Sequence, residues 1–404
     1  MAVVATAAGR HAPPPSDPGS SLRAAVSRLW VDHITWTRAY VVYATSRRSI
    51  AEYLTLLAAM VVRFVAVPLG AVISRLGVAN AGAVRLMRNQ HDIGRAIVPF
   101  YGDRAGARLR RLLKQHITIA VKMISAARHG HARRFSRLEA SWRRNAEHIA
   151  RLLSSANSAW SQADVADLLR QHLLLTAHEV DARINGRWAD DVDFVDQIYT
   201  EILTLAGVLS DGIIKQFPER FGGAPVSPAV ESLTAAMRRL WSDHVIWTRQ
   251  YIVATLGGTP DAAAAAARLL KNQEDIGHAV AAYYGEDAGV ELTRLLKEHV
   301  TIAVDLIDAV MKSDTLRLQQ ANQRWDRNAA DIAVFLSTAN PNWRTSDLLD
   351  LLTQHLNLTR DELTAHRRHH WVDDVRAFDL IQTEILTVAD ALSAGIVQQF
   401  PQRF

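Results

Sequence analysis

The chain has 404 residues, 49% of them hydrophobic, and a formal net charge of +5. This length allows two domains, each with its own hydrophobic core. The small excess of positive charge gives no indication of nucleic-acid binding. Because the chain has no cysteine, disulfides, zinc–thiolate sites and cysteine nucleophiles are excluded, and we expect a cytoplasmic location in a reducing compartment.

The composition predicts an all-α protein. Alanine, leucine and arginine dominate, while glycine and proline number only 20 and 12, and no stretch alternates as a β-strand does. Residues 1–20 are rich in Ala, Pro, Gly and Ser, so we expect a disordered tail. The short apolar start of this tail has no basic region before it, which argues against a secretory signal.

Six helical segments are expected in the first half of the chain, separated by turn residues such as Tyr101-Gly102-Asp103 and Asn185-Gly186. Ser161 is expected to cap the fifth segment. The segments are 21–46, 81–99, 103–128, 132–155, 162–185 and 190–217.

The second half repeats the first. The stretch Leu29–Arg38 (LWVDHITWTR) returns as Leu240–Arg249 (LWSDHVIWTR), and the motifs that follow return in the same order. We therefore predict two tandem duplicated six-helix antiparallel bundles. Repeat 1 is expected to span 21–221 and repeat 2 to span 229–404, with a linker at 222–228.

The first repeat contains an insertion at about 46–76. Equivalent residues are 211 positions apart before it (His33 and His244) but only 183 after it (His116 and His299). The inserted piece is apolar enough to cross a bilayer, yet Arg63 at its middle would cost at least about 2.5–3.5 kcal/mol there. We interpret residues 48–76 as an apolar helical hairpin that covers the bundle or seals a homodimer. Peripheral membrane contact through 48–76 is the alternative.

Several polar residues share helix faces with apolar ones. His116 lies within a leucine and isoleucine stripe, and His172, Thr176 and Glu179 follow one another at helical spacing. The same polar residues recur in the second half, whereas other positions, such as Lys122 and Asp305, differ freely.

These residues fit a metal site within each bundle. A buried carboxylate is costly unless it is paired, hydrogen-bonded or bound to a metal. Three imidazoles and two carboxylates per half form a ligand mixture that suits iron, zinc, manganese or copper. The candidate ligands are His33, His116, His172, Glu179 and Glu201, with His244, His299, His355, Glu362 and Glu384 in the second half. The second shell is expected to be Gln90, Asn145 and Thr176, with Gln273, Asn328 and Thr359.

Two functional hypotheses follow. Metal sites would serve redox chemistry, metal handling or small-molecule binding, whether or not the protein is an enzyme. Alternatively, the buried polar groups only fix helix register in a non-catalytic scaffold or interaction protein. Under both hypotheses we expect Arg38 to pair with Asp32 near the rim, and Arg249 with Asp243.

Known motifs give little support for a particular reaction. The chain has no repeated Glu-x-x-His, which disfavours a ferritin-type di-iron site. His91-Asp92-Ile93-Gly94 resembles the signature of HD-domain phosphohydrolases, but Glu274 replaces the histidine in the second half. We therefore interpret Ile93-Gly94 as a helix packing point. The basic cluster 366–370 has no counterpart in the first half and is interpreted as solvated surface.

The recurring motifs taken together resemble a family of bacterial all-helical proteins. These motifs are LWxDHxxWTR (29–38), NQxDIG (89–94), LLKxH (112–116), HLxLT (172–176) and QFPxRF (216–221), each of which returns in the second half. The resemblance covers nearly all of both halves. It implies an all-helical fold and no activity, substrate or cofactor.

Overall fold

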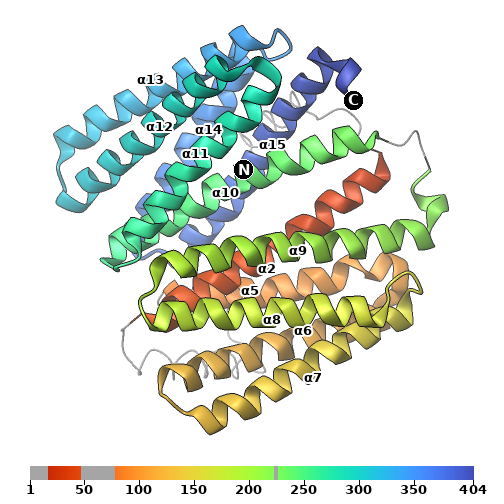
Figure 1. Ribbon diagram of the computed structural model, residues 1–404. Coiled ribbons are helices and arrows are strands. Elements are labelled where there is room, and N and C mark those ends of the chain that lie inside the picture. Colours follow the sequence, from red (N-terminus) through yellow and green to blue (C-terminus); the bar gives the residue numbers. More distant parts are fainter. Residues whose placement is uncertain (1–16, 47–77, 223–225) are drawn as a thin grey trace. The chain divides into compact units, whose positions relative to one another are not determined.

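The computed structural model describes residues 17–46, 78–222 and 226–404 (Figure 1). These residues form α-helices and two short 3-10 turns, and no strand occurs among them, which confirms the all-α prediction. They divide into two compact units, 17–225 and 226–404. The predicted insertion 48–76 and residues 1–16 of the predicted tail lie outside the described residues. Pro18–Ser20 form the first turn of α2, which is capped by Asp17, so the prediction of a disordered tail is wrong for these residues.

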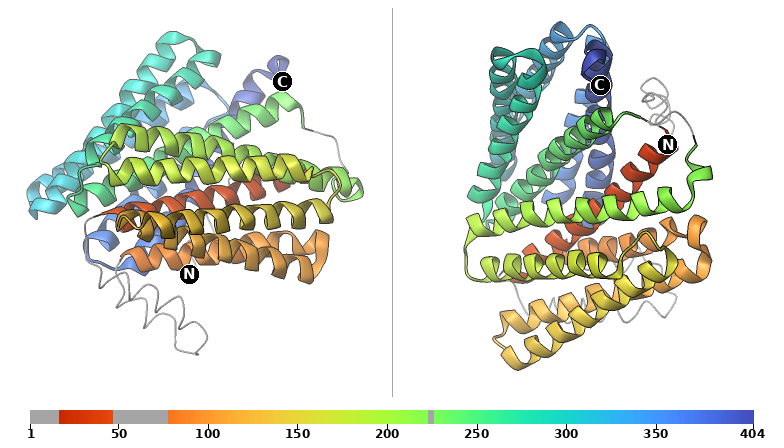
Figure 2. Two further views of the ribbon diagram at one scale, coloured as in Figure 1. Left: turned by 60° about the horizontal axis from the view of Figure 1, so that its bottom comes forward. Right: turned by 45° about the vertical axis from the view of Figure 1, so that its right-hand side comes forward.

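The first unit contains six helices among its described residues, close to the six predicted segments. Each helix packs against the next one in the chain, and α2 also packs against α9, so that the helices enclose a common core. Both α6 with α7 and α8 with α9 run side by side in Figures 1 and 2. The elements are α2 (Pro18–Thr45), α5 (Val78–Ala96), α6 (Val98–Arg128), α7 (Ala132–Ala156), α8 (Gln162–Ile184), α9 (Trp188–Gln216) and η1 (Pro218–Arg220).

The second unit has the same order of elements. Its helices again pack in sequence, and its first helix packs against its last. The elements are α10 (Pro228–Gly257), α11 (Ala262–Tyr284), α12 (Glu286–Lys312), α13 (Thr315–Ala339), α14 (Thr345–Arg367), α15 (Trp371–Gln399) and η2 (Pro401–Arg403).

Local sequence signals explain where several helices begin and end. Gly102 interrupts α6 with a φ of +77°, at the break predicted from Tyr101-Gly102-Asp103, and Gly285 separates α11 from α12 with a φ of +90°. Glycine adopts positive φ without a steric penalty. The Ser161 side chain accepts a hydrogen bond from the Asp164 backbone N–H at 3.4 Å, so the predicted cap of α8 is confirmed.

Helices α5 and α6 approach each other closely at a pair of glycines. A Cβ atom on Gly106 would lie 2.5 Å from the carbonyl oxygen of Gly94, and a Cβ on Gly94 would lie 2.9 Å from that of Gly106. Gly277 and Gly289 form the equivalent contact between α11 and α12. The interpretation of Ile93-Gly94 as a helix packing point is therefore confirmed.

One described helix, α15, is long and apolar enough to cross a membrane by length and composition alone. It packs against α10 and α14. Residues such as Phe378, Ile381 and Ile385 are at most 2% exposed within this packing. The core helix of a bundle needs the same apolar composition, because several of its faces are covered.

Gly106→Ala should lower the free energy of unfolding by about 1–3 kcal/mol, because the new methyl group overlaps the Gly94 backbone. Gly207→Ala is the matched control. Gly207 also lies within a helix, and nothing stands within 4 Å of its would-be Cβ. Its replacement should leave stability unchanged or raise it by up to about 1 kcal/mol through helix propensity. Urea titration measures both, and equal effects would contradict the proposed steric contact.

Candidate metal centre

Three buried histidines meet in the core of the first unit. His33 comes from α2, His116 from α6 and His172 from α8, and each is at most 4% exposed. The ring centroids of His33 and His172 are 5.6 Å apart, those of His116 and His172 6.2 Å, and those of His33 and His116 6.4 Å. The three rings therefore lie close together, although among the described residues only the second unit brings one ligand nitrogen from each of three histidines within 4.8 Å of the others.

The second unit brings together His244, His299 and His355 from α10, α12 and α14. Their ring centroids are 5.5, 6.1 and 6.2 Å apart. One nitrogen from each ring can be chosen so that all three lie within 4.8 Å of one another. The three ring nitrogens therefore surround one point in the buried core of the unit.

Each histidine is held by a polar side chain on the following helix. The Nδ1 atom of His116 lies 3.1 Å from Asn145 Oδ1, and that of His172 lies 3.1 Å from Glu201 Oε2. In both pairs the partner follows the histidine by 29 residues. The three pairs of the second unit, His244–Gln273, His299–Asn328 and His355–Glu384, all keep the same spacing.

This spacing of 29 residues divides each unit into three helical hairpins, each with a histidine on its first helix and the partner on its second. Only the pair His33–Gln90 differs, with 57 residues between its members. The excess of 28 residues equals the insertion predicted after the first helix. The sequence contained this signal, but it becomes meaningful only when the partners are seen to touch.

The partners determine which nitrogen of the ring carries the proton. Asn145 Nδ2 donates to the Leu112 carbonyl at 3.1 Å, so its Oδ1 faces His116 and accepts from Nδ1–H. The Glu201 carboxylate likewise accepts from the Nδ1–H of His172. A neutral ring protonated at Nδ1 has its lone pair on Nε2, which is the form that binds metals. Asn328 and Glu384 hold His299 and His355 in the same way.

His33 has a different partner. Gln90 Nε2 lies 3.1 Å from His33 Nδ1, and it also lies 3.0 Å from both the Leu86 carbonyl and Asn89 Oδ1. One NH2 group thus faces three acceptors, while its neighbour Gln90 Oε1 is buried without a donor in the described part of the chain. Turning the amide would let Oε1 accept from Nδ1–H and leave Nε2 of His33 free to bind a metal, but only if the amide also moved away from the Leu86 carbonyl and Asn89 Oδ1, which are both acceptors.

Burial keeps the imidazoles uncharged. Desolvation, together with the neighbouring His172, lowers the pKa of His116 to about 3, and burial with His355 has the same effect on His299. Desolvation followed by the two neighbouring histidines lowers the pKa of His33 and of His244 well below the usual value. At neutral pH these four rings therefore present lone pairs rather than a cluster of positive charges.

The candidate glutamates have two different roles. Glu201 and Glu384 contact a histidine through one oxygen, and the other oxygen of each is buried without a donor among the described groups. Glu179 lies elsewhere, because the seven residues that separate it from His172 advance about 10 Å along a helix. Its carboxylate accepts from Arg38 Nη1 at 2.9 Å, and Glu362 accepts from Arg249 in the second unit.

The threonines that we expected in the second shell do not contact the rings. The Thr176 hydroxyl donates to the His172 backbone carbonyl at 2.8 Å, and the Thr359 hydroxyl donates to that of His355 at 2.9 Å. Both hydroxyls are satisfied by their own helix, as is common for threonine in helices.

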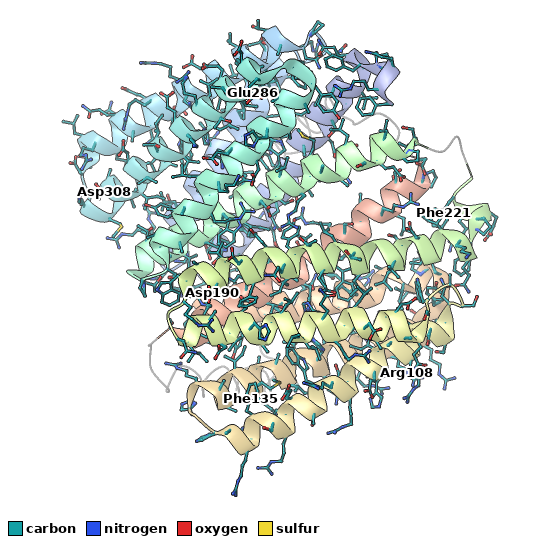
Figure 3. All side chains as sticks on the ribbon, in the orientation of Figure 1. Arg108, Phe135, Asp190, Phe221, Glu286 and Asp308 are labelled. Atoms are coloured by element: carbon teal, nitrogen blue, oxygen red, sulfur yellow. The ribbon has the colours of Figure 1, made fainter. Side chains whose placement is uncertain are left out.

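The expected pairing of Arg38 with Asp32 near the rim is wrong. Arg38 is 5% exposed, and its guanidinium binds Glu179 and both oxygens of Asp191, with Nη2 lying 2.6 Å from Asp191 Oδ2. Asp191 lies in the first turn of α9, next to Asp190, which is labelled in Figure 3. Asp32 instead binds Arg28 at 3.0 Å and Arg85 at 2.7 Å. Helical periodicity had identified buried faces without showing which faces meet.

The sequence did not identify Arg183 as part of this ion network, and His366 was interpreted as solvated surface. Arg183 Nη1 donates to Asp191 Oδ2 at 2.8 Å, and His366 occupies the equivalent place, with Nδ1 3.3 Å from Asp374 Oδ1. The basic cluster 366–370 is therefore not wholly solvated, since His366 is only 7% exposed. The recurrence of Trp-x-Asp-Asp-Val at 188–192 and 371–375 could have indicated Asp191 and Asp374.

Burial and charge act against each other in the ion networks. Burial opposes the positive charge of Arg38, but Asp191 and Glu179 raise its pKa above the ordinary value. In the second unit, desolvation outweighs the attraction of Arg249 and raises the pKa of Glu362 to about 7. Burial also acts to raise the pKa of Asp374, but there Arg249 and His366 outweigh it and lower the pKa to about 2.

A comparison with protein-family models, curated proteins and solved structures gives no match for this chain.

The metal-free protein should lose stability as the pH falls from 6.5 towards 4. The unfolded state takes up protons on its histidines in this range, and the folded state does not, because the pKa values of His116 and His299 are about 3. Each such group contributes up to about 1.4 kcal/mol per pH unit. Glu362, with its pKa raised to about 7, has the opposite effect on stability, because it takes up its proton in the folded state between pH 7 and 4.5. In the second unit this effect acts against those of His244 and His299.

Urea unfolding at several pH values separates these contributions. Between pH 6 and 4, the unchanged protein should lose about 1.4 kcal/mol more stability per pH unit than His299→Gln does. An identical pH profile for the two proteins would show that His299 is protonated in the folded state.

Replacing Arg38 should be costly, because Glu179 and Asp191 would remain buried with less compensating charge. Arg38→Met is expected to lower the free energy of unfolding by about 3–5 kcal/mol. Arg23→Ala is the control: Arg23 pairs with Asp211 at a surface where the two side chains are 37% and 61% exposed. Its removal should cost at most about 1 kcal/mol. Similar losses in chemical denaturation would argue against the buried network.

Proposed function

We propose that the protein binds a divalent transition-metal ion in each unit, through the Nε2 atoms of His33, His116 and His172 and of their counterparts in the second unit. The observation that carries this proposal is the convergence of three buried imidazoles, each of which has its Nδ1 atom in contact with a side chain on the following helix. Such a centre is suited to metal handling or to metal-assisted binding of a small molecule.

The donor set favours zinc or copper over manganese. Imidazole nitrogens suit zinc, copper, iron and nickel, whereas manganese prefers carboxylate and carbonyl oxygens. Glu179 and Glu362 are engaged by arginines, so we leave them out of the ligand set. Three protein nitrogens leave a fourth position for water or a small ligand, as in catalytic zinc sites.

Glu201 and Glu384 would support the centre from outside. A carboxylate that accepts the Nδ1–H of a ligating histidine fixes the ring and makes its Nε2 a stronger donor. It also places a negative charge near a cation that would otherwise lie in an apolar core. Asn145 and Asn328 would orient their histidines without adding charge.

The duplication belongs to the same proposal. The pairs His116–Asn145 and His172–Glu201 recur with the same spacing and with distances equal to within 0.1 Å as His299–Asn328 and His355–Glu384. This correspondence supports two tandem six-helix bundles that descend from one ancestor. We also infer a cytoplasmic protein, because a chain without cysteine makes no use of an oxidising compartment.

Elemental analysis of protein purified without added chelator tests the proposal. We expect close to two metal ions per chain. His116→Ala combined with His172→Ala should reduce this to one, and adding His299→Ala and His355→Ala should reduce it to none. His148→Ala, an exposed histidine on α7, is the control and should leave the content unchanged.

A second measurement covers variants that lose stability. Adding Zn2+ to chelator-treated protein should raise the midpoint of thermal unfolding, since a ligand that binds only the folded state stabilises it by mass action. Gln90→Glu should increase zinc affinity, because a carboxylate accepts the Nδ1–H of His33 as Glu201 does for His172. Substoichiometric metal that is indifferent to all of these substitutions would reject the metal centre.

The way Gln90 contacts His33 favours the second candidate, a scaffold whose buried polar network fixes helix register. Its amide nitrogen faces Nδ1, which makes Nδ1 the acceptor in the metal-free ring. A ring in that form carries its proton on Nε2. Under this hypothesis the histidine variants change stability and helix packing, and zinc has no effect on the thermal midpoint.

A further inference from the structure

The first unit contains a cavity of about 310 Å3 beside its three histidines. Helices α2, α5, α6, α7 and α8 enclose it, and most of its wall is hydrocarbon. The residues that matter for its shape are Ile117 and Val121 on α6, Trp142 on α7, and Ala177 and Val180 on α8. Cavities of this size and polarity are typical of sites for small organic ligands.

The inner end of the cavity begins one helical turn beyond the histidines. Thr37 and Thr176, which line it, follow His33 and His172 by four residues each. Their hydroxyls donate to the carbonyls of those histidines at 2.7 and 2.8 Å. Each hydroxyl hydrogen is therefore used within its own helix, so neither threonine is left to donate a hydrogen bond to a ligand.

The outer end of the cavity lies where α2, α6 and α8 finish. Arg128 and Arg183, near the ends of α6 and α8, bind the carbonyl of Ala44 and the hydroxyl of Thr45 at the end of α2. The cavity reaches this end at Ile184, which is 38% exposed, and at Phe135 in the first turn of α7 (Figure 3). A ligand could thus enter from the end of the unit.

The second unit shows what kind of group suits this space. The residue equivalent to Ala177 is Arg360, whose guanidinium lies over the ring of Trp325, the equivalent of Trp142, with 5.4 Å between its carbon and the ring centroid. Arg360 is held there by Asn322 at 2.7 Å, by Asn357 at 3.0 Å and by the carboxylate of Asp326, which balances its charge. A planar group therefore covers the tryptophan in one unit, whereas alanine leaves it lining a cavity in the other.

We propose that the cavity of the first unit binds a flat, uncharged, apolar molecule that stacks on Trp142, and that Arg360 blocks the equivalent place in the second unit. A planar ligand would gain stacking and the burial of its apolar surface. The polar side chains of Asp181 and Asn185 lie at the end of the cavity near Ile184 and the rest of the wall is mostly hydrocarbon, so a charge deep inside the cavity would be unfavourable. This site is separate from the histidine centre and does not depend on it.

Fluorescence titration with N-phenyl-1-naphthylamine, a flat and uncharged probe, tests the proposal on full-length, chelator-treated protein. We expect one probe per chain. Ala177→Arg, which copies the second unit, should weaken binding at least tenfold, and Val180→Phe should do the same by filling the cavity without adding charge. Leu174→Arg is the matched control, since Leu174 lies on the same helix and is 54% exposed. This variant should bind the probe as tightly as the unchanged protein does.

Three results would overturn the proposal. The first is an absence of binding to the unchanged protein, and the second is binding that persists in both Ala177→Arg and Val180→Phe while their helical circular dichroism is intact. The third is binding that appears only after residues 48–76 are deleted, which would assign the cavity to a segment of this chain. Because the assay uses metal-free protein, its outcome is independent of the metal content.

Discussion

The two units depend on one interaction, the hydrogen bond between the Nδ1 atom of a buried histidine and a polar side chain on the next helix. An imidazole in a dry core is tolerated when it is neutral and its donor is satisfied. Asn145 and Glu201 meet this requirement for His116 and His172. The same bonds join the two helices of a hairpin at a fixed register, so one interaction orients the rings and aligns the helices that carry them.

The arginine network of each unit lies apart from the histidine triad, whose own carboxylate contact is made by Glu201 or Glu384. Arg38, Glu179, Asp191 and Arg183 form a compact network at the first turn of α9, while the histidines meet deeper along the same helices. A buried arginine needs close carboxylates. Unpaired carboxylates beside the rings would raise the pKa of the imidazoles and favour their charged form. Placing the two groups about two helical turns apart satisfies both requirements.

The two units differ at positions around their shared histidine triads. The triads and their partners are unchanged, but Arg183 becomes His366 and Ala177 becomes Arg360. The first replacement puts an imidazole beside Asp374 where the first unit has a guanidinium beside Asp191, and burial raises the pKa of Glu362 in that network to about 7. The second places a guanidinium against a tryptophan that lines a cavity in the other unit. Retained centres with diverged surroundings suggest two copies that no longer perform the same task.

The sequence by itself determined the all-helical fold, the position of the helices and the residues that lie on buried faces, because all three follow from local propensity and from a period of 3.6 residues. The break at Gly102 and the packing of Gly94 are examples. Only the tertiary structure decided which buried groups meet. His172, Glu179 and Glu201 carry the same signal of buried polarity, yet Glu201 faces a histidine and Glu179 faces Arg38. Contacts between helices depend on how whole faces pack, and residues on one face that are separated by two turns meet different neighbours.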